Sequence, residues 1–99
     1  MNIFDLPPLP LPDELTTKLN DSDSTRIERI ISTGQTSDWY DQVETEFVIL
    51  LDGLATVEFE NSRIVTMKKG DTLTIKPHER HRVSSTSSEP PCNWLCIFY

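Results

Sequence analysis

The chain has 99 residues, enough for one compact domain and too few for a second core. Hydrophobic residues make up 36% and charged residues 25%, which is a globular composition rather than a disordered one. Nine basic residues against sixteen acidic ones give a net charge of −7, which argues against nucleic acid and anionic membranes as partners.

The N-terminal segment is expected to form an arm rather than a strand of a central sheet. Residues 6–12 hold four of the seven prolines, and proline removes amide donors and favours extended backbone. A short helical turn capped by Asp13 is predicted over Asp13–Leu19. We therefore divide the chain into a Pro-rich arm with a helical turn, residues 1–22, and a β-domain, residues 23–99.

From Arg26 onward, short apolar or alternating runs separated by turn signals predict an all-β sandwich or barrel. The run Glu46–Asp52 is apolar on both parities, as in a strand covered on both faces. Gly53 and Gly70 fall at strand boundaries, where glycine tolerates a positive φ. The predicted strands are Arg26–Ser32, Glu46–Asp52, Leu54–Glu60, Arg63–Lys68, Thr72–Lys76, His81–Ser84 and Asn93–Tyr99, and Ser84–Pro91 is predicted to be a polar loop.

The two cysteines and the N-terminus bear on the compartment. Cys92 and Cys96 fall in the same late apolar segment, so as strand residues they lie roughly 13 Å apart at about 3.3 Å per residue. That distance is too long for a disulfide between them, and two buried thiols in a reducing compartment are expected. The N-terminus lacks the features of a signal peptide, and no run is long enough for a transmembrane helix. A cytoplasmic location is therefore expected.

Strand parity predicts a carboxylate and an imidazole on inward faces of the β-domain. His81 shares its parity with Val83, opposite to two neighbouring arginines that favour water. Glu46 shares its parity with Val48 and leads an apolar strand. A carboxylate there is costly unless its charge is met, which a buried histidine, a metal ion or both would do.

These stretches resemble the two motifs of the cupin family. The first motif, G-x5-H-x-H-x3,4-E-x6-G, has its frame in Gly34–Gly53, with Glu46 at the glutamate position. The second, G-x5-P-x-G-x2-H-x3-N, has its frame in Gly70–Ser85, with His81 at the histidine position and Lys76 at the proline position. The residues of both stretches resemble those of small stand-alone bacterial cupins. The resemblance implies a double-stranded β-helix, also called a jelly-roll barrel, over about three quarters of the chain.

The resemblance also implies a metal site, which this chain keeps only in part. Metal-binding cupins use two histidines and a glutamate of the first motif with one histidine of the second. Here the first-motif histidine positions hold Tyr40 and Gln42, whereas Glu46 and His81 keep the ligand types. The implied ligands of a divalent ion such as Fe, Mn, Ni or Zn are Glu46, His81 and the amide oxygen of Gln42, a set that secures such ions weakly. Tyr40 and His78 are candidate ligand-binding residues, and His78 supplies a second imidazole if its turn folds inward.

Three functions stay open on this basis. A metalloprotein would carry out isomerase, oxygenase or lyase chemistry on a small polar metabolite such as a sugar or sugar phosphate. A binding module would hold a small molecule in the barrel mouth without chemistry. A structural homodimer would pack the arm or a sheet face on a second copy. The retained Glu46 and His81 favour the first function, and the missing histidines favour the other two.

Overall fold

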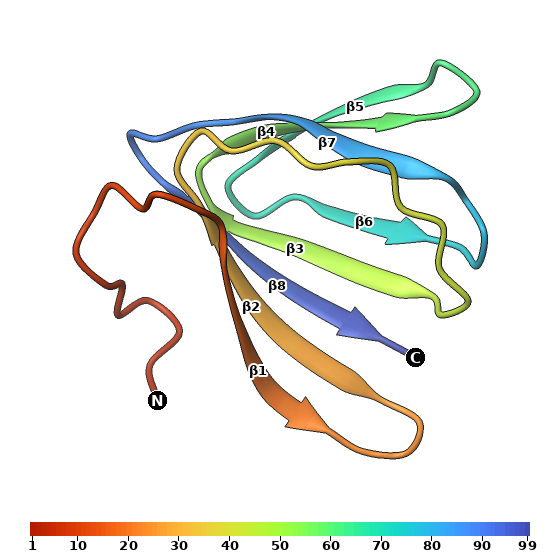
Figure 1. Ribbon diagram of the computed structural model, residues 1–99, viewed down its shortest axis with the longest axis horizontal. Helices are drawn as coiled ribbons and strands as arrows, with labels where there is room; N and C mark the ends of the chain where they lie inside the picture. The colour runs from red at the N-terminus through yellow and green to blue at the C-terminus, as the bar shows by residue number, and fades with distance from the viewer.

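The computed structural model describes all 99 residues as two antiparallel sheets that face each other, with no helix and so none that could span a membrane. Figure 1 shows the two layers and the N-terminal arm beside them. The predicted all-β jelly-roll barrel is confirmed. In sheet order, the five-stranded sheet consists of β1 (Leu15–Asp21), β2 (Arg26–Ser32), β8 (Cys92–Phe98), β3 (Glu46–Asp52) and β6 (Thr72–Ile75), and the three-stranded sheet consists of β5 (Ile64–Lys68), β4 (Leu54–Phe59) and β7 (His81–Thr86).

All seven strands predicted from the sequence are present, and two of them, β2 and β3, have the predicted bounds. The largest difference is in β7, which continues to Thr86 and so takes up the start of the predicted loop Ser84–Pro91. The extra residues pair with β4, with Ala55 opposite Thr86 across a bulge. Pairing with a neighbouring strand therefore outweighs the polar composition of this segment.

The predicted helical turn over Asp13–Leu19 is wrong, because Leu15–Asp21 forms the edge strand β1. This strand pairs antiparallel with β2 over its whole length, interrupted by one irregularity after Lys18. Thr16 and Thr17 are β-branched and favour extended backbone. The hydrogen bonds to β2 replace the local bonds of a helical turn, so tertiary pairing overrides the capping signal of Asp13.

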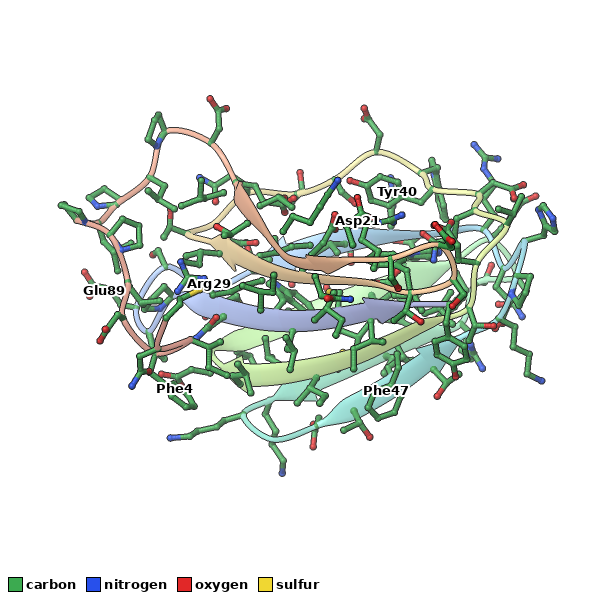
Figure 2. All side chains as sticks on the ribbon, turned by 90° about the horizontal axis from the view of Figure 1, so that it is seen from below. Phe4, Asp21, Arg29, Tyr40, Phe47 and Glu89 are labelled. Carbon is green, nitrogen blue, oxygen red and sulfur yellow. The ribbon has the colours of Figure 1, made fainter.

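The arm that precedes β1 is docked on the outer face of the five-stranded sheet. Arg29 Nη1 donates to the carbonyl oxygen of Asp5 at 2.8 Å, and Asn93 Nδ2 donates to that of Ile3 at 2.9 Å. Arg29 and Asn93 are both buried beneath the arm. Figure 2 shows Arg29 and Phe4 at the same end of the molecule. The arm therefore covers part of the sheet that would otherwise face water.

The core lies between the sheets and comes from the inward parity of each strand. Gly53 joins β3 to β4 with φ +101°, and a Cβ there would lie 2.7 Å from Cys92 Cα, so only glycine fits this turn. Cys92 and Cys96 are free and buried, as predicted. The buried apolar residues of the central cluster are Val48, Leu50, Ala55, Val57, Phe59, Met67, Ile75, Cys92, Trp94, Cys96 and Phe98.

Candidate functional site

A cavity of about 270 Å³ lies between the two sheets. Glu46 and His81 lie at its more polar end, and Trp94 lies at its more apolar end, where Ser32 bonds to both the indole and Glu14. Antiparallel register sets this gradient. Phe98 of β8 lies between Arg26 of β2 and Glu46 of β3, so charged residues flank one end of the strand. Further along, Trp94 of β8 lies beside Ile30 of β2. The same wall of the cavity therefore offers charge and apolar surface a few residues apart.

Glu46 and His81 face each other at the polar end, which confirms the parity prediction for both. Their side chains are only 11% and 4% exposed. His81 Nδ1 donates to the carbonyl oxygen of Glu79 at 2.8 Å, and this bond fixes Nε2 as the ring atom turned toward Glu46. The distance from Nε2 to Glu46 Oε1 is 3.7 Å, too long for a hydrogen bond. His81 Nε2 therefore has no hydrogen-bond partner in the protein.

The loop before β3 holds the His81 ring in place. The Tyr40 amide donates to the His81 carbonyl at 2.7 Å, and the His81 amide donates back at 3.1 Å. The Tyr40 and Phe59 rings lie 5.7 Å and 6.1 Å from the imidazole, centre to centre. The Ser37 amide also bonds to the Val83 carbonyl at 3.0 Å. Figure 2 shows Tyr40 on this loop, along one side of the strands.

Burial dominates the electrostatics of the cavity. Burial raises the pKa of Glu46. The hydrogen bond that Gln42 Nε2 donates at 3.1 Å and the coulombic effect of His81 lower this pKa, but by less than burial raises it. Burial also raises the pKa of the Cys96 thiol well above its usual range. The pKa of the Tyr40 phenol is raised by burial first and then by the negative charges of Glu14 and Glu46. All of these shifts disfavour added negative charge in the cavity.

The structure brings together four of the five candidate residues from the sequence and separates the fifth. His78 lies outside the cavity, on an exposed turn with φ +61°. Its amide donates to the Gln42 carbonyl, and its ring Nδ1 donates to Asp41 Oδ1 at 2.7 Å. The turn therefore directs the His78 ring outward and does not supply a second imidazole to the cavity. The four cavity-lining candidates are Tyr40, Gln42, Glu46 and His81.

Sequence reasoning missed three charged residues of the cavity wall: Glu14, Arg26 and Glu28. Arg26 bonds to Glu28 at 3.1 Å and to Glu44 at 2.7 Å, and its guanidinium stacks on Phe98 at 4.1 Å. The signal for Arg26 and Glu28 was present, because they share the parity of Ile30 in β2. Glu14 gave no such signal, since its position depends on β1 being a strand.

The donor set does not fit a divalent transition metal. No group of three histidine, cysteine, aspartate or glutamate side chains converges in the structure. Gln42 presents its amide nitrogen, rather than its oxygen, to Glu46. The raised pKa values of Tyr40 and Cys96 keep both groups protonated at neutral pH. Of the predicted ligands, only the Glu46 carboxylate and the His81 imidazole remain, whereas a zinc site uses three or four protein ligands.

The chain matches the cupin domain family over residues 28–98. A proposed mannose-6-phosphate isomerase from Ralstonia eutropha is 37% identical, with a TM-score of 0.92 over 99% of this chain and 94% of that one. A cupin superfamily protein from Desulfitobacterium hafniense is 17% identical, with a TM-score of 0.79 over 92% of this chain and 81% of that one.

An RmlC-like cupin from Shewanella frigidimarina is 14% identical, with a TM-score of 0.75 over 86% of this chain and 74% of that one. These two more distant likenesses concern the fold alone. No curated protein matches the chain at a significant level. The family match, the 37% identical relative and the two facing sheets agree, and the chain belongs to the cupin family.

Proposed function

We propose that this cupin binds a small organic molecule in its barrel cavity without a metal ion. The observation that carries the proposal is the 3.7 Å gap between Glu46 Oε1 and His81 Nε2 at the wall of a cavity of about 270 Å³. Neither atom is hydrogen-bonded to the other. A ligand group placed between them could bond to the Glu46 carboxyl and to His81 Nε2 at once.

The rest of the cavity supports binding by burial. Its lining includes Ile30, Val57 and Trp94, against which an apolar ligand body would lose contact with water. The Tyr40 side chain is half exposed at the edge of the cavity, so its ring is in a position to contact an entering molecule. Polar groups at one end would then orient the ligand, and apolar groups at the other would supply most of the affinity.

A binding test follows from this arrangement. A library of small metabolites would be screened by ligand-observed NMR against the wild type, Glu46→Gln and Glu60→Gln. Glu60 is an exposed glutamate on the outer surface and provides the matched control. We expect at least one ligand whose signal is lost with Glu46→Gln and kept with Glu60→Gln. Ligands that bind all three proteins equally, or none, would contradict the cavity as the binding site.

The metal-free part of the proposal is tested by elemental analysis. Protein purified without an affinity tag or chelator would be reconstituted with iron, manganese, nickel and zinc, with His81→Ala beside the wild type. We expect no stoichiometric metal in either protein, because one imidazole and one carboxylate hold such ions weakly. Near-stoichiometric metal in the wild type that is lost in the variant would instead make this a metallocupin.

A second candidate function is isomerisation of a sugar phosphate, as proposed for the 37% identical relative. The observation in its favour is the facing carboxyl and imidazole, two groups that can transfer a proton between neighbouring atoms of a bound substrate. Incubation with mannose 6-phosphate and measurement of the ketose product tests it, with His81→Ala as the negative control. Turnover by the wild type that His81→Ala lacks would establish the activity. The expected homodimer stays a prediction, which sedimentation velocity tests.

A further inference from the structure

We infer that the cavity is selective for a small organic cation, an amine with a compact apolar body, over neutral and phosphorylated ligands. This inference rests on the proposed function, since it names the ligand class of the same cavity. It depends on three independent features of the wall: its charge balance, the acceptor atoms that face the gap, and the apolar end.

The charge balance of the wall is negative. Glu14, Glu28 and Glu46 line the cavity, and Arg26 is the one lysine or arginine among the lining residues. The Arg26 guanidinium is already engaged by two carboxylates and by the Phe98 ring. A phosphate group is usually bound by free arginine, lysine or backbone N–H donors, and no free cation faces this cavity. A phosphorylated ligand would therefore meet carboxylates without compensation.

The polar end presents hydrogen-bond acceptors where a ligand would need donors. The His81 side chain is 96% buried; its Nδ1 donates to the Glu79 carbonyl, and its Nε2 has no hydrogen-bond partner in the protein. Glu46 Oε1 lies 3.7 Å from this nitrogen and accepts a hydrogen bond from Gln42 Nε2. The Glu46 carboxyl also interacts with the Cys96 thiol. When the His81 ring is in its neutral form with the proton on Nδ1, both atoms are acceptors, and the three N–H donors of an ammonium group can meet both at once, whereas a hydroxyl has only one donor. The geometry therefore favours an amine over an alcohol.

The apolar end and the size of the cavity limit the rest of the ligand. Ile30, Val57 and Trp94 line this end, and the Glu14 carboxylate there already accepts a hydrogen bond from Ser32 at 3.3 Å. The part of the ligand away from the ammonium should therefore be mainly hydrocarbon. A volume of about 270 Å³ lies just below the range for drug-sized ligands, which favours a compact ring or short chain. A highly hydroxylated sugar would leave its polar groups unpaired against this surface.

The titration behaviour of the wall agrees with this assignment. Burial raises the pKa of both Glu14 and Glu46, which means that neither carboxylate has enough positive charge near it to offset its desolvation. The negative charges of the same two residues contribute to the raised pKa of Tyr40. A bound ammonium beside Glu46 would supply positive charge that offsets part of this desolvation.

The test uses ligands that share one carbon skeleton and differ in charge. Binding of cyclohexylamine, cyclohexanol and cyclohexanecarboxylate at pH 7.5 would be measured by NMR titration, with mannose 6-phosphate as a fourth ligand. We expect the ammonium to bind about tenfold more tightly than the alcohol, as a charge-assisted hydrogen bond is worth roughly 1.4 kcal/mol more than a neutral one. We expect no binding of the carboxylate or the phosphate.

Three variants test which carboxylates cause the preference for the ammonium ligand. Glu46→Gln should abolish the preference for the ammonium, Glu14→Gln should reduce it, and Glu60→Gln on the outer surface should leave it unchanged. Far-UV circular dichroism checks that each variant folds, and Glu14→Gln keeps the test valid if Glu46→Gln does not. Equal binding of amine and alcohol, or tighter binding of mannose 6-phosphate, would overturn the cation preference and leave the small-molecule function standing. Absence of binding by all four ligands would also overturn the cation preference, and together with a failed metabolite screen it would overturn the proposed function as well.

Discussion

Two histidines three residues apart form two carboxyl–imidazole pairs in opposite environments. His78 lies 2.7 Å from Asp41 on the surface, where the two side chains are 65% and 55% exposed. His81 lies 3.7 Å from Glu46 inside the barrel, where both are almost fully buried. The closer pair is solvated and bonded to itself, whereas the more distant pair is not bonded to itself and faces a cavity. Burial and unsatisfied bonding capacity, rather than short distance, therefore distinguish the pair that we propose binds a ligand.

The largest expected difference between the two pairs is in stability on removal of the histidine. His81→Ala deletes a buried ring that contacts Tyr40 and Phe59, and we expect a loss of about 2–4 kcal/mol in the free energy of unfolding. His78→Asn keeps a residue type that tolerates the positive φ of this turn, and we expect a change within about 0.5 kcal/mol. Urea unfolding at pH 7 measures both. Equal losses would remove the distinction between the sites.

The pH dependence of stability sharpens the same comparison. The pKa of Glu46 in the folded protein is raised above its usual 4.5 by burial, so the folded state binds this proton more tightly than the unfolded state does. The contribution of Glu46 is therefore most favourable below pH 4.5 and becomes less favourable as the pH rises through the folded pKa.

Glu46→Gln does not titrate and should gain stability relative to the wild type as the pH rises through that window. Its carbonyl oxygen can still accept the hydrogen bond from Gln42. Asp41→Asn, in the exposed pair, is the control and should follow the wild-type curve closely. Urea unfolding between pH 4 and pH 8 provides the measurement. A Glu46→Gln curve parallel to that of the wild type would show that burial does not set the Glu46 pKa.

A smaller effect is expected from Gln42, which donates a hydrogen bond to the buried Glu46 carboxyl. Gln42→Ala removes the hydrogen bond to Glu46 Oε1, and we expect a loss of about 1 kcal/mol at neutral pH. The pKa of Glu46 should rise further, because this bond opposes the effect of burial. NMR titration of the Glu46 carboxyl carbon reports the shift directly. A lower pKa in this variant would mean that Gln42 presents its oxygen to Glu46.

The sequence predicted seven of the eight strands and the inward direction of Glu46 and His81, because side-chain alternation is a local property of a strand. It left His78 open between a surface turn and the barrel mouth, since the outward turn depends on a left-handed backbone and a bond to the loop at Gln42. It also missed Glu14, whose place at the cavity depends on β1 pairing with β2. Features that depend on long-range contacts therefore could not be predicted from the local sequence pattern.

The smallest expected effect is the coupling within the exposed pair, measured by a double-mutant cycle on Asp41 and His78. The Nδ1–Oδ1 distance of 2.7 Å suggests a strong interaction if judged by length alone. Water competes for both groups, however, and exposed pairs of this kind contribute roughly 0–1 kcal/mol. We expect Asp41→Asn, His78→Asn and the double variant to give a coupling energy below about 0.5 kcal/mol, decreasing in 1 M salt. A coupling above about 1 kcal/mol would show that short distance outweighs solvation on this surface, and the ranking of the two pairs by burial would then have to be given up.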